Sequence, residues 1–171
     1  MGKAYKILVT GAFNSGKTAF VSAASEIPVV TTERRITDDQ AQVKEVTTVA
    51  MDYGQAKVGD DLLHLYGTPG QERFEFMWDI LAREADALLV LVDSTDGSSL
   101  TMARRMLRRL RRKRRGVPFL VAATKQDGRR PMSPQRIADS LDLDADIVFT
   151  CDAREERHTK QILRRLSQLL S

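Results

Sequence analysis

A glycine-rich segment between an apolar run and a helix-like run limits the folds open to this chain more than any other feature. Residues 5–10 have the apolar character of a buried strand, and residues 17–25 continue as a helix. Gly11 and Gly16 allow backbone conformations that turn successive N–H groups inward. The following helix directs its positive dipole end at the same point. These features predict a phosphate-binding loop with the sequence Gly11-Ala12-Phe13-Asn14-Ser15-Gly16-Lys17-Thr18.

Each residue of this loop has its own expected role. Asn14, Ser15 and Gly16 would present backbone N–H groups to phosphate oxygens. Lys17 would neutralise the β- and γ-phosphates, and Thr18 would place its hydroxyl on Mg²⁺. The loop therefore predicts a nucleotide and Mg²⁺ as ligands, but it does not distinguish GTP from ATP.

Apolar runs that alternate with helix-like segments predict an α/β fold with a largely parallel sheet. We expect one domain over residues 1–171, with six strands and about five helices on both sides of the sheet. Residues 54–61 are expected to hold a turn, and the polar stretch 31–45 shows no clear periodicity. The expected strands are residues 5–10, 47–53, 62–66, 87–92, 117–124 and 147–150.

The loop after the expected strand 117–124 carries a carboxylate that can select a base. Asp127 is an acceptor with two oxygens, and guanine presents N1–H and N2–H₂ side by side, whereas adenine has no such donor pair. Thr124-Lys125-Gln126-Asp127 resembles the Asn-Lys-x-Asp guanine motif of the Ras superfamily of small GTPases. The resemblance implies that Lys125 lies along the base. Thr124 departs from the motif, because a hydroxyl replaces the amide that would contact guanine N7. A solvated pair of Lys125 and Asp127 is the alternative interpretation.

A shorter segment after the last expected strand, Cys151-Asp152-Ala153-Arg154, resembles the Thr-Ser-Ala-Lys segment of the same family. The resemblance implies that the Ala153 N–H meets guanine O6, with Asp152 and Arg154 on either side. The resemblance to the Ras superfamily extends over essentially the whole chain. It implies that the chain has a Ras-like P-loop NTPase fold and that it binds GTP and GDP with Mg²⁺.

Two further segments resemble the nucleotide-sensing switches of that family. In the first, a threonine four residues before an aspartate coordinates Mg²⁺ when the γ-phosphate is present; Thr48 before Asp52 has that spacing, and Thr47 is the alternative. In the second, residues 65–74 resemble Asp-x-x-Gly-Gln-Glu. The resemblance implies that the Gly70 N–H reads the γ-phosphate and that Gln71 orients the attacking water.

Two positions depart from the family pattern in ways that bear on hydrolysis. Gly67 stands where the family has an aspartate that supports Mg²⁺ through water, and Phe13 stands where Ras has a small glycine. The Gly-Thr-Pro-Gly-Gln form resembles a branch of prokaryotic Ras-like GTPases, of the gliding-polarity and conservon type, whose members often pair with roadblock-type regulators. The aromatic cluster that follows fits either a core or an effector surface; it comprises Phe74, Phe76, Met77 and Trp78.

Residues 104–115 concentrate the basic charge, with nine arginines and lysines in twelve positions and no acid. Subtracting these nine charges from the net charge of +4 leaves −5 for the rest of the chain. The default interpretation is a solvated helix face. However, uncompensated cations on one helix repel each other, which favours an anionic partner such as a membrane, RNA or an acidic protein.

Other features of the chain point to a cytoplasmic protein that reaches a membrane only peripherally. No apolar run approaches the ~20 residues that span a bilayer. We expect no internal disulfide, because Cys151 is the single cysteine. We also expect no signal peptide and no lipid anchor.

Three functions remain open on the sequence alone. The first is a GTP-binding switch that hydrolyses GTP slowly and signals to a partner through its switch segments. The second is a nucleotide-locked scaffold that does not hydrolyse GTP, for which Gly67 and Phe13 are the reason. The third is an ATP-using phosphoryl-transfer enzyme, for which the sequence shows no acceptor cluster. His64 and His158 are not spaced as zinc ligands.

Overall fold

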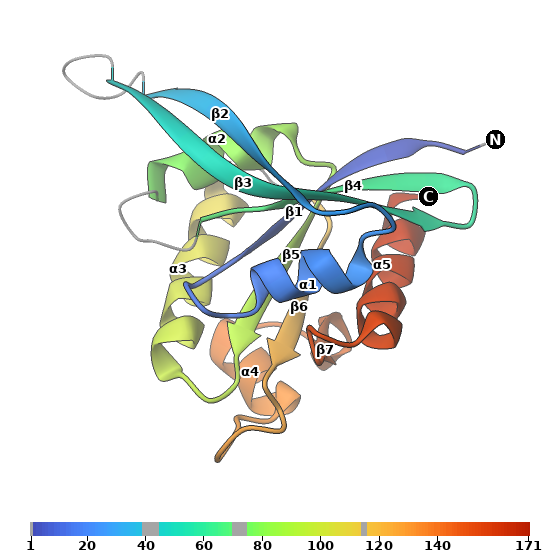
Figure 1. Ribbon diagram of the computed structural model, residues 1–171. Helices are drawn as coiled ribbons and strands as arrows, with labels where there is room; N and C mark the ends of the chain where they lie inside the picture. Colours follow the sequence, from blue (N-terminus) through green and yellow to red (C-terminus); the bar gives the residue numbers. More distant parts are fainter. Residues whose placement is uncertain (1, 39–44, 70–74, 114–115) are drawn as a thin grey trace.

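The computed structural model describes residues 2–38, 45–69, 75–113 and 116–171, which form one seven-stranded sheet flanked by helices (Figure 1). The strand order is β2-β3-β4-β1-β5-β6-β7. The β1, β4, β5, β6 and β7 neighbours pair in parallel, and the β2–β3–β4 pairs are antiparallel. The elements are β1 Ala4–Gly11, α1 Lys17–Ala24, β2 Val30–Asp38, β3 Glu45–Val58, β4 Asp61–Gly67, α2 Glu75–Glu84, β5 Ala87–Asp93, α3 Gly97–Lys113, β6 Phe119–Thr124, α4 Pro134–Leu141, the short η2 Ala145–Ile147, β7 Val148–Thr150 and α5 Glu156–Leu170.

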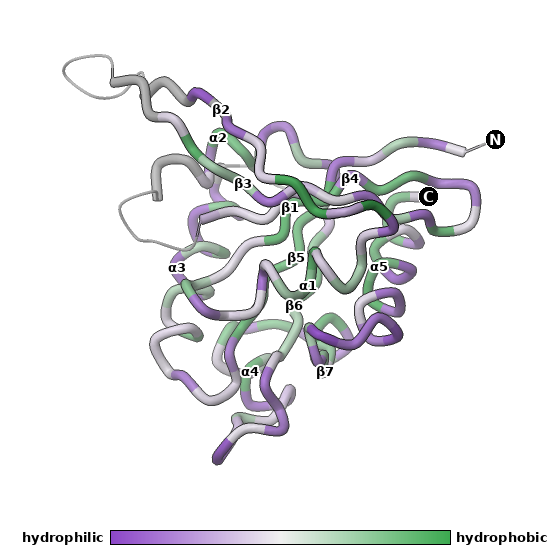
Figure 2. The backbone as a smooth tube through the Cα atoms, in the orientation of Figure 1, coloured by the Kyte–Doolittle hydropathy of each residue, from purple (hydrophilic) through white to green (hydrophobic). Residues whose placement is uncertain are grey.

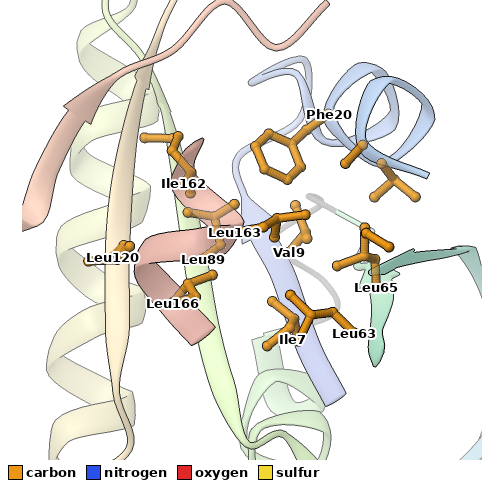
Figure 3. Close-up of a cluster of buried hydrophobic side chains, with 14 of the residues drawn as sticks. Ile7, Val9, Phe20, Leu63, Leu65, Leu89, Leu120, Ile162, Leu163 and Leu166 are labelled. Carbon is orange, nitrogen blue, oxygen red and sulfur yellow. The ribbon is translucent and has the colours of Figure 1, made fainter. Parts of the chain in front are cut away.

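The sheet is covered on both faces, because its central strands are apolar on both sides. All seven residues of β5 are buried. Helices α1 and α5 cover one face, where Phe20 and Leu163 pack against Val9 (Figure 3). Helices α2, α3 and α4 cover the other face, with Trp78 among the buried residues there. The α/β class with a mostly parallel sheet is therefore confirmed.

The number of strands differs from the expected six, because residues 30–38 form an additional edge strand, β2. The charged residues in this stretch obscure a run of β-branched side chains that favours an extended backbone. An edge strand pairs on one side only and tolerates charged side chains, which also discourage edge-to-edge aggregation. Polarity alone was thus a poor guide to the structure of this segment.

The expected turn over residues 54–61 is also wrong in its extent. Strand β3 continues to Val58, which pairs with Asp61, so the turn is only the two residues Gly59 and Asp60. Gly54 lies inside β3, where a Cβ atom would meet the Ser25 Cβ at 2.7 Å. This glycine permits close packing of the end of α1 on the strand and does not mark a turn.

The helices of the described residues include none that is both long enough and apolar enough to cross a membrane. The parallel strands β1, β5 and β6 end at the same edge of the sheet. This edge is where ligands bind in open α/β sheets. The loops that follow β1, β6 and β7 come together there.

Candidate nucleotide-binding site

A cleft of about 660 Å³ opens at the carboxyl edge of the sheet and is formed by three loops that lie far apart in the sequence. It brings together nine residues that the sequence analysis assigned to a nucleotide. Thr95, Gly128 and Arg129 complete its wall, together with Ala19 of α1. The nine residues are Asn14, Ser15, Gly16, Thr124, Lys125, Asp127, Asp152, Ala153 and Arg154.

The phosphate loop has a backbone that its glycines make possible. Gly11 has a φ of 145°, and a Cβ atom there would lie 2.5 Å from the Leu91 carbonyl oxygen. Gly16, with a φ of 107°, begins α1. The Lys17 ammonium donates to the carbonyl oxygens of Gly11 and Ala12, both at 2.8 Å. The loop therefore holds its lysine inside the ring of backbone that would surround a phosphate.

The charge of Lys17 is costly in this position. Burial lowers the pKa of Lys17 from 10.5 to about 8, and the nearby Asp52 carboxylate opposes this shift. A phosphate anion would relieve the cost, because an opposite charge stabilises the ammonium form. Nucleotide binding and the protonation of Lys17 are therefore linked.

Asp52 is a site residue that the sequence analysis used only as a spacing marker. Its Oδ2 accepts a hydrogen bond of 2.7 Å from the Thr18 hydroxyl. Asp52 pairs with Gly67 across β3 and β4, and a Cβ atom on Gly67 would lie 3.5 Å from the Asp52 Cβ. The Asp52 carboxylate on the neighbouring strand therefore lies beside the position where the family pattern has its aspartate. The glycine at position 67 was the signal that could have prompted a search for it.

The loop after β6 is tied to the phosphate loop by two side chains. The Thr124 hydroxyl lies 2.8 Å from the Ser15 carbonyl oxygen and 3.1 Å from that of Val92. Lys125 donates to the Asn14 carbonyl oxygen at 2.8 Å. Thr124 is buried, so its hydroxyl positions the two loops and does not face the cleft as an amide would.

Asp93 holds the other side of Lys125. The Lys125 ammonium lies 3.0 Å from Asp93 Oδ2. Burial alone would raise the pKa of Asp93, but hydrogen bonds from Thr95 and the Lys125 ammonium keep it below its ordinary value. Asp93 therefore remains ionised and fixes Lys125 between the strand and the phosphate loop.

The expected base-reading carboxylate contacts the third loop. Arg154 Nη2 lies 3.2 Å from Asp127 Oδ2, and Arg154 Nε lies 3.0 Å from Asp152 Oδ1. The hydrogen bonds from Arg154 lower the pKa of Asp152. Arg154 and Asp127 are both exposed, so their ion pair is weak and easily exchanged for a ligand.

Some predicted site residues lie apart from this cleft. Gly70 and Gln71 fall outside the described residues, as does Phe74. Thr48 is exposed on β3 and pairs with Arg35. Four residues of extended strand span ~13 Å, so Thr48 lies well away from the Asp52–Thr18 contact in this conformation.

Two large side chains noted in the sequence, Phe13 and Trp78, have opposite surroundings. Phe13 is 73% exposed at the rim of the phosphate loop. Trp78 is 2% exposed and belongs to the core. Of the aromatic cluster, Trp78 is thus a packing residue.

A metal ion at Thr18 would have few ligands from the protein. Among the described residues, no group of three or more histidine, cysteine, aspartate or glutamate side chains is placed to hold a metal ion. The Thr18 hydroxyl and the Asp52 carboxylate are both oxygen donors of the kind that Mg²⁺ prefers. Mg²⁺ usually keeps several waters and takes its other ligands from substrate phosphates, so these residues fit the ion.

Known proteins resemble this chain in both sequence and fold. A family described as "Conserved hypothetical ATP binding protein" matches residues 28–170, which lie entirely after the phosphate loop. Human ADP-ribosylation factor-related protein 1 is 30% identical over 125 residues, which is 72% of this chain and 60% of that protein. Human EF-hand calcium-binding domain-containing protein 4B is 28% identical over 97% of this chain, but the match is only 22% of that protein.

A solved structure shares the architecture of the whole chain. The small GTPase Arl6 (BBS3) from Trypanosoma brucei, with the bound nucleotide analogue GppNp, superposes with a TM-score of 0.73. The match covers 98% of this chain and 97% of that chain at 19% identity. The fold of the described residues is therefore that of a small GTPase.

Proposed function

This chain belongs to the family described as conserved hypothetical ATP-binding proteins, and we propose that it is a GTP-binding molecular switch that hydrolyses GTP slowly. The observation that carries the proposal is the 660 Å³ cleft, in which a phosphate loop and a base-selecting carboxylate face one space. The likeness to ADP-ribosylation factor-related proteins supports it, although the chain matches 60% of their length.

Asp127 is the group that would choose guanine over adenine. Guanine offers two adjacent N–H donors to a carboxylate, whereas adenine would leave the carboxylate without partners, which costs binding energy. Arg154 already donates to Asp127 Oδ2, so a guanine base would take over this contact or share it. The family that matches this chain is described as ATP-binding, so the identity of the bound base is the first property to test.

Competition between nucleotides tests the base. With purified protein and a fluorescent GDP analogue, GTP should displace the analogue at least tenfold more effectively than ATP. Asp127→Asn replaces one carboxylate oxygen by an NH₂ donor and should favour xanthosine over guanosine triphosphate, because xanthine carries a carbonyl where guanine has its amino group. Equal displacement by GTP and ATP would contradict the proposal.

Mg²⁺ would accompany the nucleotide, held through Thr18 and the Asp52 carboxylate. The ion supplies charge neutralisation to the phosphates. Within the chain, Asp52 orients the Thr18 hydroxyl, and Lys17 places a second positive charge among the phosphate oxygens. Together these groups would hold the triphosphate chain in one orientation.

Gln71 is the residue we assign to the attacking water, on the strength of the resemblance alone. Gly70 would read the γ-phosphate, and Thr48 would join the metal once the triphosphate is bound. Release of γ-phosphate in a single turnover tests this. Gln71→Ala should slow release at least tenfold while leaving nucleotide affinity within twofold, and an unchanged rate would exclude the role.

A scaffold that holds nucleotide without hydrolysis is the second candidate. Two observations favour it: Gly67 carries no carboxylate, and Phe13 stands 73% exposed at the rim of the phosphate loop. The same single-turnover measurement distinguishes the two, because a scaffold would show no γ-phosphate release even with a regulator added.

Regulators and effectors would act through the switch segments of a cytoplasmic protein. A groove of about 330 Å³ is lined by residues of strands β1, β2, β3 and β4 and of helix α2, with Met51, Tyr53, Tyr66 and Leu81 among them. Tyrosine and methionine are enriched at protein interfaces. We place a GTPase-activating partner, of the roadblock type, and an effector in this region.

A further inference from the structure

We propose that the outer side of α3 is a docking surface for an anionic lipid membrane, and that charge alone holds the protein there without insertion into the bilayer. This inference goes beyond the proposed nucleotide switch and does not depend on it. Seven of the nine basic residues counted in the sequence belong to α3; Arg114 and Arg115 lie outside the described residues.

The apolar side of α3 is already used by the core. The hydropathy colouring of Figure 2 alternates along the helix, as in a basic amphipathic helix that would insert into a membrane. In this fold, however, the apolar residues face the sheet and its neighbouring helices. They are Leu100, Met102, Ala103, Met106, Leu107 and Leu110, all at most 8% exposed. Only the charged side remains for a partner.

Four arginines line hollows on that outer side, where Arg105 is also exposed. Arg108, Arg111 and Arg112 line one shallow hollow, and Arg104, Arg108 and Arg111 line a second beside Asp142. No residue of α3 is acidic, so the helix itself supplies no carboxylate to neutralise these four arginines. Arginine binds phosphate oxygens with a planar pair of donors, which suits the phosphodiester groups of lipid headgroups.

Contacts with neighbouring elements hold parts of this surface in place. Arg104 donates to the Ser140 carbonyl oxygen at 3.1 Å. The Arg111 guanidinium lies 5.5 Å from the centre of the Phe119 ring, which restrains it without using its charge. Arg109 has a different role, because it forms a bidentate ion pair with the buried Asp79 of α2. We therefore exclude Arg109 from the surface.

The geometry favours a membrane over a nucleic acid. Helix α3 lies along the sheet between α2 and α4, so it presents a ridge to its surroundings and cannot enter a groove. The four arginines Arg104, Arg108, Arg111 and Arg112 span ~12 Å of helix, and a planar surface can meet all four at once. Helix α3 contains no aromatic side chain on which bases could stack.

Flotation with lipid vesicles tests the proposal. Each basic residue near an anionic membrane contributes about fivefold to the partition coefficient, so three of them contribute about a hundredfold. The full chain should float with vesicles of equal parts phosphatidylglycerol and phosphatidylcholine at ~0.1 M salt, and not at ~1 M salt, where the Debye length falls to ~3 Å. Vesicles of phosphatidylcholine alone should not bind it.

The variants separate the surface from net charge. Replacing Arg108, Arg111 and Arg112 by glutamine should lower partitioning about a hundredfold. The double variant Arg108→Gln with Arg112→Gln keeps the contact between Arg111 and Phe119. It should lower partitioning about 25-fold, and it serves as the test if the triple variant folds poorly. The matched control replaces three exposed arginines of α5, Arg157, Arg164 and Arg165, and should change partitioning by less than threefold.

Three outcomes would overturn the proposal: no flotation with anionic vesicles at ~0.1 M salt, an equal loss in the α5 variant, or stronger binding to single-stranded RNA than to vesicles at equal phosphate concentration. The readout needs no nucleotide and no hydrolysis. Its failure would leave the proposed switch intact, and failure of GTP binding would leave the surface intact.

Discussion

At the scale of single residues, the site depends on where negative charge lies around Thr18 and Lys17. Asp52 accepts the Thr18 hydroxyl hydrogen bond and also opposes the desolvation of the Lys17 ammonium. One carboxylate on β3 therefore serves both the metal position and the phosphate-binding lysine. A Cβ atom on Gly67, its neighbour across the strand pair, would make ordinary contact with the Asp52 side chain, 3.8 Å from Oδ2, so this position lies directly beside the carboxylate.

Removing this carboxylate should weaken the hold on Mg²⁺. Replacing a residue that orients a metal ligand typically lowers metal affinity by about 10- to 100-fold. We expect Asp52→Gly to raise, by about that factor, the Mg²⁺ concentration needed to retain a fluorescent nucleotide. The double variant Asp52→Gly with Gly67→Asp moves the carboxylate to the adjacent strand and should restore most of the loss. A double variant no better than Asp52→Gly would show that the position of the carboxylate is not interchangeable.

Lys17 should make both stability and nucleotide affinity depend on pH. The unfolded chain keeps the lysine proton up to pH 10.5, whereas the ligand-free folded protein loses it at about 8. Between these values the unfolded state binds more protons, so this group makes the ligand-free protein more stable as the pH rises. Thermal melts from pH 7.5 to 10 should show this gain relative to Lys17→Met.

Nucleotide affinity should change in the opposite direction over the same range. The phosphates require the charged form of Lys17, so the free protein must take up a proton to bind once the pH exceeds about 8. Affinity should fall by up to about tenfold per pH unit above that value. Lys17→Arg remains charged throughout and should show no such slope; an equal slope in this variant would assign the effect to another group.

At the scale of elements, the sequence predicted six of the seven strands and missed β2, one of the two edge strands. The run over β5 and the phosphate loop are local signals, since continuous apolarity and fixed glycine spacing survive in any tertiary context. Residues 30–38 belong to the sheet through their pairing with β3, and this pairing is long-range information. The same limit applies to Asp52, whose role depends on a contact with Thr18 across 34 residues.

The ion pair between α2 and α3 should contribute to stability. Arg109 donates to both carboxylate oxygens of Asp79, at 2.9 and 2.8 Å, and Asp79 is 7% exposed. Asp79→Ala leaves a cation that is only partly solvated, and we expect it to lower the free energy of unfolding by about 1–3 kcal/mol. Urea denaturation measures this. The exposed Asp139→Ala, on α4, is a control that should change the free energy of unfolding by less than about 0.5 kcal/mol.

At the scale of the whole molecule, the pairing of β2 with β3 fixes where Thr48 lies relative to the phosphate loop. Nine residue pairs join β2 to β3, and they include Thr48 opposite Arg35. Thr48 and Asp52 lie ~13 Å apart on one extended strand. The two residues therefore cannot reach Thr18 at the same time unless part of the pairing between β2 and β3 opens. A triphosphate that recruits Thr48 must overcome the energy of these strand pairs, whereas a diphosphate need not.

The protein should therefore bind GDP more tightly than GTP until the ladder is weakened. Alternate residues of an antiparallel strand donate their N–H to the partner strand, so one of Arg34 and Arg35 does so and the other does not. Proline has no backbone N–H, so a proline at the residue that donates to β3 removes one hydrogen bond of the β2–β3 pairing. Of Arg34→Pro and Arg35→Pro, the variant at that residue should shift the ratio of GTP to GDP affinity at least threefold toward GTP. The other variant is its matched control. Identical ratios in the wild type and both variants would contradict this prediction.

Strand β2 leaves the sheet unfinished on its outer side. Within the described part of the chain, β2 has a neighbouring strand on one side only, so a row of its backbone N–H and C=O groups is available to a strand from another molecule. Its side chains carry charges of both signs, with Glu33 and Arg35 two residues apart on one side of the strand. A visiting strand can extend the sheet only if its own charges complement this pattern, so the edge accepts selected partners and resists indiscriminate polymerisation.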